Sequence, residues 1–354
     1  MKKRVWSVIT ALTMTAALLS GCGGKNAEAA NTQASQTTAV GSKEQGEGGQ
    51  NAEIVLKYAE LNSEEHPMAQ GAVKFADLVS EKSGGRIRID LYFSGTLGDE
   101  KTCMQGVQIG TIDLFRANTN NMADYGCSIM NALALPYVFR DLDHLSSTLR
   151  NDIGKELLDS VQSSGTQMVA LSYMEEGPRN LFFTNKSVTK LSDLKGLKIR
   201  VPETEVMIKT MKALGANPTP ISYSELYTSL QTGVVDAAEN AVTGYVTNSF
   251  FEVAPYYVKD AHTFGPGLIV MSEKSFNKLS AEDQGIIREA AVEAQDYVLE
   301  LTKEIEDQYY KDLDEKGIHV LEVEDIENWS AAVKDVYQDY GTEVADLISK
   351  IQAQ

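Results

Sequence analysis

Short apolar runs alternate with helical patterns along most of this 354-residue chain, and that alternation constrains the fold more than any other feature. Strand-like runs lie at 54–59, 86–93 and 111–117, and a helical spacing of apolar residues fills 72–79 between the first two. Strands that alternate with helices are typical of parallel sheets with helices on both faces. The sequence therefore predicts an α/β fold with parallel strands.

The same alternation starts again at Met168. Strand-like runs follow at 168–173, 181–184, 197–201 and 234–239, with helices expected at 203–214 and 223–232. About 300 residues remain after Glu53, which is long for a single hydrophobic core. Two lobes are therefore expected.

A very long helical pattern opens at Leu279–Asp283 and runs to about Lys316. Ser280 or a neighbouring residue is expected to cap it, because a hydroxyl there accepts a backbone N–H of the first turn. At 1.5 Å per residue, such a helix is long enough to lie across two lobes. A coiled coil is the alternative, but the apolar spacing does not keep a strict heptad.

The N-terminus has the pattern of a secretory signal. Lys-Lys-Arg at 2–4 precedes an uncharged stretch over 5–20, and Leu-Ser-Gly-Cys at 19–22 resembles the bacterial lipobox. Residues 1–22 are therefore expected to be a lipoprotein signal peptide, with a lipid on Cys22. The expected location is extracytoplasmic, either anchored to the cell membrane by that lipid or periplasmic. A plain signal peptide that happens to contain a cysteine is the alternative.

The segment after the signal and the overall charge limit the partners of this chain. Residues 23–52 are rich in small and polar residues without apolar periodicity, which predicts a flexible linker. The formal net charge of −18 becomes about −21 once the three positive charges of the signal are removed. Such an acidic chain lacks the excess of positive charge that binds nucleic acid, and anionic lipid repels it. Membrane contact is therefore expected through the lipid anchor only.

Two arginines interrupt apolar strands. Arg200 lies in the run Gly196–Pro202, and a guanidinium held on regular structure offers a rigid fork of donors that matches a carboxylate. Arg116 interrupts 111–117 in the same way, and Asn118 follows at the end where open α/β sheets bind ligands. These residues are candidates for an acid-binding cleft. For Arg200, the alternative is a surface residue on an edge strand.

The sequence lacks the familiar catalytic and metal-binding patterns. The chain has four histidines, His66, His144, His262 and His319. None has a metal-ligand spacing or lies beside a nucleophile elbow, and no Gly-rich phosphate loop is present. We therefore expect no enzymatic activity, no cofactor and no metal. Cys103 and Cys127 are left as either a disulfide or two buried thiols.

Five stretches carry a family resemblance when they are taken together and in order. They are SGTLGDE at 94–100, ALPY at 134–137, LKGLKIRVP at 194–202, LGANPTP at 214–220, and the segment 227–240, which contains LQTGVVDAAEN. With them, the chain resembles the substrate-binding proteins of tripartite ATP-independent periplasmic (TRAP) transporters, the DctP family. The resemblance covers nearly all of 54–271.

The resemblance implies two α/β lobes that exchange strands across a hinge, with a long helix spanning both and a ligand trapped by closure. Lobe I would comprise 53–176 with about 265–304, and lobe II 177–264 with about 305–354, which includes the C-terminal helices. It further implies a monomer that delivers its ligand to the TRAP membrane permease subunits. That transport is driven by an ion gradient, commonly sodium, without nucleotide.

The resemblance also assigns ligand-binding residues. Arg200 matches the arginine that pairs with the ligand carboxylate, Arg179 a second arginine that faces the ligand, and Asn240 an asparagine that contacts the same carboxylate. Ala241 replaces the proline that family members usually have after this asparagine. Arg116 and Asn118, at the end of the strand 111–117, stay candidates because of their position in the sheet.

Three further positions match the family's ligand contacts but have structural alternatives. Glu100 is either a polar ligand contact or simply an acid at a helix N-terminus. Tyr223 either packs on the ligand or belongs to the core, and His66 either faces the ligand or lies in a loop that caps a helix.

The expected function is the capture of an organic acid outside the cytoplasm. A hexuronate or related sugar acid is our first choice and a C4-dicarboxylate the next, because Glu100, Asn118 and His66 suit hydroxyl groups. A sensor or receptor lipoprotein without a transport role is the alternative. A carbohydrate- or lactone-acting hydrolase is a third option, without sequence support.

Overall fold

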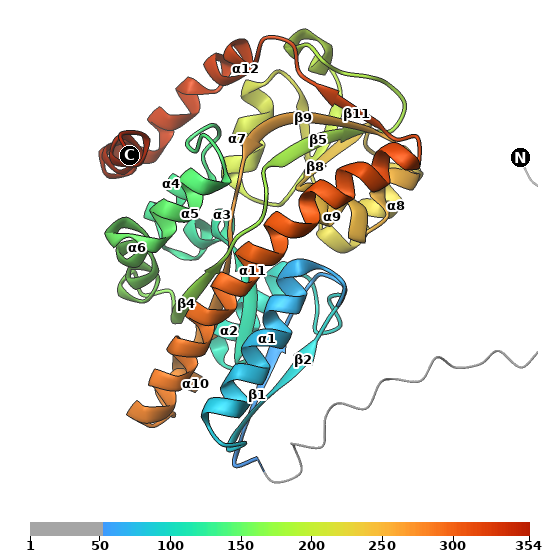
Figure 1. Ribbon diagram of the computed structural model, residues 1–354. Coiled ribbons are helices and arrows are strands. Elements are labelled where there is room, and N and C mark those ends of the chain that lie inside the picture. Colours follow the sequence, from blue (N-terminus) through green and yellow to red (C-terminus); the bar gives the residue numbers. More distant parts are fainter. Residues whose placement is uncertain (1–51) are drawn as a thin grey trace, which may run out of the picture. The chain divides into compact units, whose positions relative to one another are not determined.

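The computed structural model describes residues 52–354, which form an α/β fold with two mixed sheets (Figure 1). The first sheet has five strands, in the order β2 (Ile87–Tyr92), β1 (Ile54–Ala59), β3 (Leu114–Asn118), β10 (Gly267–Ser272) and β4 (Met168–Met174). The second has six, in the order β11 (His319–Glu322), β9 (Tyr256–Thr263), β5 (Arg179–Phe183), β8 (Ala237–Asn240), β6 (Lys198–Val201) and β7 (Asn217–Pro220). The predicted signal peptide, Cys22 and residues 23–51 of the linker lie outside the described residues.

Helices connect and cover the strands. They are α1 (Pro67–Lys82), α2 (Glu100–Ile109), α3 (Thr119–Met122), α4 (Asn131–Ala134), α5 (Leu142–Arg150), α6 (Asp152–Ser163), α7 (Glu205–Ala213), α8 (Leu226–Gln231), α9 (Val242–Thr247), α10 (Glu273–Phe276), α11 (Ala281–Glu315), α12 (Ile326–Ala332) and α13 (Gly341–Gln352). Within 52–354, none of them combines the length and the apolar character that a membrane span needs.

The prediction of parallel strands holds for only part of each sheet. β1 runs parallel to β2 and β3, but β10 runs antiparallel to β3 and β4. In the second sheet, β5 runs antiparallel to β8 and β9. The chain passes between the sheets after β4 and again after β9, so β10 enters the first sheet without a crossover helix on that sheet. The lobe boundaries expected from the sequence stay a prediction.

The long helix predicted at the C-terminal part of the chain is α11, 35 residues in length. Ser280 caps it as expected, since its hydroxyl accepts the backbone N–H of Asp283. At ~1.5 Å per residue the helix is about 52 Å long, and it contacts α1 and β4 of the first sheet's layer and α9 and β11 of the second's (Figure 1). α1 approaches it closely at Gly71, where a Cβ would lie 2.2 Å from Val298 Cγ2.

The two cysteines within the described residues are buried free thiols, which decides between the two alternatives left by the sequence. Cys103 lies on α2, where its Sγ is 3.5 Å from the carbonyl oxygen of Gly98. Cys127 Sγ lies 3.2 Å from Ser160 Oγ, on α6. Burial raises the pKa of the Cys103 thiol to about 12, so it stays protonated and unreactive at neutral pH.

Candidate functional site

All eight residues expected at the ligand site line one pocket between elements of the two sheets. We define this inner pocket by its lining residues: Leu61, Asn62, His66, Met68, Glu100, Arg116, Asn118, Glu176, Arg179, Arg200, Pro202, Tyr223 and Asn240. Its cavity volume is about 40 Å³. Their role as ligand contacts stays a prediction, but the structure brings them together from segments that are far apart in the sequence.

Arg200, on β6, is a buried guanidinium without a carboxylate partner. Its side chain is 2% exposed, and its Nε donates to the carbonyl oxygen of Ile221 at 2.8 Å. The guanidinium carbon lies 5.8 Å from the centre of the Tyr223 ring. Among residues 52–354, no carboxylate oxygen lies within ion-pair distance of it. Burial lowers the pKa of Arg200, because a charged group loses hydration in the protein interior.

Arg116, on β3, is paired with a carboxylate that the sequence analysis missed. Its Nη2 lies 2.8 Å from Glu60 Oε1, and its Nε lies 3.2 Å from both carboxylate oxygens. Glu60 is fully buried directly after β1, at the end of a parallel strand where polar site residues gather. The sequence did carry a signal for Glu60, namely an acidic residue immediately after the apolar run 54–59. The positive charge of Arg116 is therefore balanced within the protein.

Glu100 and Asn118 extend the same network. Arg116 Nη1 donates to Asn118 Oδ1 at 3.0 Å, and Asn118 Nδ2 donates to Glu100 Oε1 at 3.1 Å. Glu100 begins α2, after the cap Asp99, so the position fits both the pocket and the helix N-terminal alternative. Burial raises the pKa of Glu100, although Arg116 and Arg200 oppose the shift.

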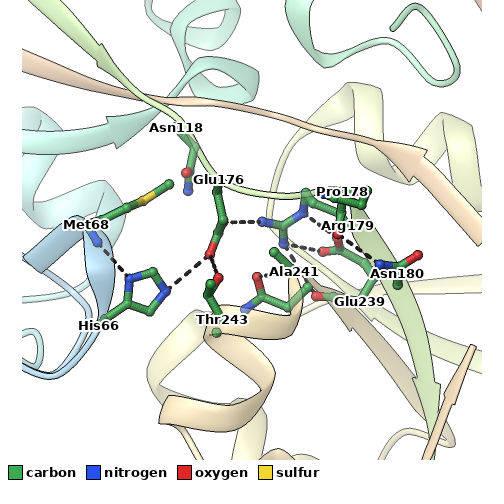
Figure 2. A network of polar contacts seen from close by, with 12 residues as sticks. His66, Met68, Asn118, Glu176, Pro178, Arg179, Asn180, Glu239, Ala241 and Thr243 are labelled. Atoms are coloured by element: carbon green, nitrogen blue, oxygen red, sulfur yellow. Dashed lines mark hydrogen bonds and ion pairs between the residues drawn. The ribbon is translucent and has the colours of Figure 1, made fainter. Parts of the chain in front are cut away.

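Arg179, the first residue of β5, is also paired. Its Nε lies 2.6 Å from Glu239 Oε2 and its Nη2 lies 2.9 Å from Glu239 Oε1, as Figure 2 shows. Glu239 lies on β8, which pairs with β5. Burial works against ionisation of Glu239, yet Arg179 and His262 hold its pKa at about 2. Two of the three pocket arginines thus have their own carboxylate.

His66 links the start of α1 to Glu176, which follows β4. The backbone N–H of Met68 donates to His66 Nδ1 at 3.1 Å, which leaves the hydrogen on Nε2 (Figure 2). That Nε2 lies 3.2 Å from Glu176 Oε1, and Thr243 Oγ1 donates to the same oxygen at 2.5 Å. His66 is therefore both the helix cap of the alternative reading and a pocket residue. Burial opposes ionisation of Glu176, but His66, Arg179 and Thr243 lower its pKa to about 2.

Tyr223 is held in place by two asparagine side chains. Its hydroxyl accepts Asn240 Nδ2 at 3.2 Å and Asn248 Nδ2 at 2.9 Å. The backbone N–H of Ala241 donates to Asn240 Oδ1 at 2.9 Å, a bond that proline could not make. Gly244 leaves room for this amide, since a Cβ there would lie 2.5 Å from Asn240 Nδ2. Alanine in place of the family's usual proline thus adds a bond that orients Asn240.

A second and larger space adjoins the inner pocket. We call it the outer cavity and define it by its lining residues: Leu61, Ser63, Ser94, Gly95, Gly98, Asp99, Glu100, Tyr223, Ser224, Tyr227, Asn248 and Phe250. Its volume is about 410 Å³. Leu61, Glu100 and Tyr223 line both spaces, and none of the three pocket arginines lines the outer cavity.

His262 lies behind the Arg179–Glu239 pair and was not expected at the site. The side chains of His262, Asp260 and Glu239 are fully buried. His262 Nδ1 lies 2.8 Å from Asp260 Oδ2, and its Nε2 lies 3.6 Å from Glu239 Oε2. Burial opposes protonation, but the two carboxylates raise the pKa of His262 to about 9. The imidazolium therefore supports the carboxylate that holds Arg179.

Raising the pH from 7 to 9 is expected to destabilise the protein through His262. Because its folded-state pKa of about 9 exceeds the ordinary 6.5, the folded state binds the proton more tightly. Its contribution is present below pH 6.5 and is lost as the pH rises through 9. The melting temperature should fall by roughly 3 °C more than in His262→Gln. Thermal denaturation followed by circular dichroism at both pH values measures this.

The matched control for that experiment is His319→Gln, since His319 is exposed. It should show the same pH dependence as the unaltered protein. If the melting temperature falls equally in His262→Gln and in the unaltered protein between pH 7 and 9, His262 is not the titrating group.

The chain matches the family model DctP, bacterial extracellular solute-binding protein, family 7, over residues 58–343. The 2,3-diketo-L-gulonate-binding periplasmic protein of Escherichia coli K12 is 32% identical over 300 residues, which cover 84% of this chain and 90% of that protein. These matches confirm the family expected from the sequence.

Solved structures share the fold. A TRAP periplasmic solute-binding protein from Bradyrhizobium sp. BTAi1, in complex with α/β-D-galacturonate, has 33% identity and a TM-score of 0.81 and covers 84% of this chain and 99% of its own. One from Pseudomonas putida F1, with bound D-glucuronate, has 31% identity and a TM-score of 0.82 and covers 85% and 97%. The two-sheet α/β fold is thereby confirmed, and the relatives are solute-binding proteins rather than enzymes. The chain therefore belongs to family 7 of the bacterial extracellular solute-binding proteins, the substrate-binding proteins of TRAP transporters.

Proposed function

We propose that this protein captures a sugar acid with a single carboxylate, a hexuronate as first choice, and delivers it to a TRAP membrane permease. One observation carries the choice of ligand. Within the described part of the chain, Arg200 is buried without an anionic partner, whereas Arg116 and Arg179 each form an ion pair with a buried carboxylate. A buried unpaired charge is costly, so a ligand carboxylate that pairs with Arg200 gains a large share of its binding free energy there.

The charges around the pocket argue for one carboxylate rather than two. Arg116 is offset by Glu60 and Arg179 by Glu239, which leaves Arg200 as the pocket arginine without its own carboxylate. A C4-dicarboxylate would bring its second charge close to Glu176 and Glu100, where like charges repel. Hydroxyl groups suit the same side chains, because they donate to carboxylates and accept from amides such as Asn118.

The relatives support the same class of ligand. Galacturonate and glucuronate, bound in the two solved structures, and 2,3-diketo-L-gulonate, in the name of the Escherichia coli protein, are all sugar acids with one carboxylate.

In the proposed mechanism, the acid enters between the two sheets and its carboxylate pairs with Arg200 and Asn240. Contacts from the first sheet, including Arg116 and Asn118, then favour the closed state by the extra affinity they add. The permease accepts this closed form, and a lipid on Cys22 would keep the protein near the membrane.

A thermal-shift screen of the mature protein tests the proposal. D-Galacturonate, D-glucuronate, sialate and succinate are compared with neutral glucose. A ligand at 100 times its dissociation constant stabilises by ~2.7 kcal/mol, which raises the melting temperature of a protein of this size by about 4 °C. Hexuronates should give that shift and succinate much less. A shift with succinate alone, or with glucose alone, would overturn the single-carboxylate site.

A further inference from the structure

The outer cavity offers more room than a single sugar acid needs. The inner pocket, at about 40 Å³, holds only a few atoms, since one water molecule needs ~10–15 Å³. The carboxylate end of a sugar acid at Arg200 fills it, and the far end of the acid points into the outer cavity of about 410 Å³, most of which stays unfilled. Volumes of ~300–1,000 Å³ are typical of sites for ligands larger than one six-carbon acid.

The walls of the outer cavity have the chemistry that sugars need. Tyr223 and Tyr227 provide aromatic surface, on which the C–H faces of a sugar ring pack, and the buried ring of Phe250 lies behind Tyr223. Tyr227 is half-buried at the start of α8, and its hydroxyl donates to Glu252 Oε2 at 2.9 Å, which fixes its ring. Tyr223 meets Phe250 edge to face at 6.1 Å between ring centres. These rings form a rigid apolar wall.

Polar groups surround this wall. Ser63, Ser94 and Ser224 line the cavity together with Asn248, the residue that also holds Tyr223. The hydroxyl of Ser63 is buried and has no hydrogen-bond partner within 52–354. A buried hydroxyl normally has a partner, so Ser63 is suited to bind a ligand hydroxyl.

We propose that the outer cavity binds a second sugar unit, so that the natural ligand is an acidic disaccharide: a sugar acid joined, at the end away from its carboxylate, to one further sugar. The acid end pairs with Arg200, and the second ring packs against Tyr227. The inference rests on the proposed function of the inner pocket. It adds a second binding region on the opposite side of Leu61, Glu100 and Tyr223, the residues that line both spaces.

Isothermal titration calorimetry of the mature protein tests the inference with three probes. They are D-glucuronate, an aldobiouronic acid in which glucuronate is joined through C1 to a second sugar, and cellobionate, in which a sugar acid carries glucose at O4. At least one disaccharide should bind as tightly as D-glucuronate or more tightly. If both bind more weakly than D-glucuronate, the outer cavity does not bind a second sugar, and the inference fails while the proposed function stands.

Two variants of the outer cavity sharpen the test. Tyr227→Ala removes one aromatic wall and should weaken disaccharide binding by about two- to tenfold with little effect on D-glucuronate. Ser224→Trp fills the cavity from an exposed position and should block the disaccharide more strongly than the monosaccharide. Tyr309→Ala, at a half-buried tyrosine of α11 that lines neither space, is the matched control.

The outcomes separate the two proposals. If none of the three acids binds, the proposed function fails together with the inference. If the acids bind but Tyr227→Ala and Ser224→Trp weaken the monosaccharide and the disaccharide equally, the outer cavity is not a separate region and the inference alone is wrong.

Discussion

Replacing Arg200 with alanine is expected to weaken D-glucuronate binding by about 100- to 1,000-fold. The guanidinium is buried and has no carboxylate partner among residues 52–354. It therefore stabilises the complex with the ligand but contributes little to the stability of the free protein. Removing a buried unpaired charge should even stabilise the free protein, by about 1 kcal/mol. Titration calorimetry and urea unfolding of the same variant measure both effects.

The combination of weaker binding and a more stable fold separates a ligand-binding arginine from a structural one. Arg200→Lys keeps the charge but loses the planar fork, and should fall between the alanine variant and the unaltered protein. Arg140→Ala, at an exposed arginine away from the pocket, is the control and should change neither quantity. Unchanged affinity in Arg200→Ala would remove this residue from the site.

Glu60→Gln is expected to destabilise the free protein by about 3 kcal/mol. Glu60 is fully buried against Arg116, and an amide at this position leaves the guanidinium buried without a counter-charge. The pocket then has two unpaired cations, so succinate should gain affinity relative to D-glucuronate. Urea unfolding gives the stability, and competition calorimetry gives the ratio of the two affinities.

The control for this change is Glu289→Gln. Glu289 forms an exposed ion pair with Lys82, 2.7 Å between Nζ and Oε1, and exposed pairs contribute about 0–1 kcal/mol. Suppose that Glu60→Gln lowers the free energy of unfolding by less than about 1 kcal/mol and leaves the ligand preference unaltered. Arg116 then does not need Glu60, and the charge argument for a single carboxylate is wrong.

The local sequence pattern predicted the positions of strands and helices better than it predicted which strands pair and in which direction. The strand around Arg200 and the helix capped by Ser280 follow from residues a few positions apart, and both are present. The direction of β10 depends instead on the earlier passage of the chain into the second sheet, which no local pattern records. That is why the expected parallel sheets became mixed ones.

The same limit applies to the site. The sequence pattern marked Arg116 and the family resemblance marked Arg179, but their partners Glu60 and Glu239 lie 56 and 60 positions away. Glu239 becomes a partner only because β8 pairs with β5 in a register that places it opposite Leu181. The pattern that makes Arg116 a candidate for an acid-binding cleft does not show that the fold gives it a carboxylate of its own.

The outer cavity also determines how salt affects the rate of capture. Asp99 and Glu100 line it, and the whole chain has a formal charge of −18, so an approaching anion is repelled before it reaches Arg200. At 0.1 M salt, interactions between exposed charges more than ~10 Å apart are largely screened, whereas a buried pair is screened much less. Higher ionic strength therefore speeds the association of an acid with this protein, while the lifetime of the bound complex stays nearly constant.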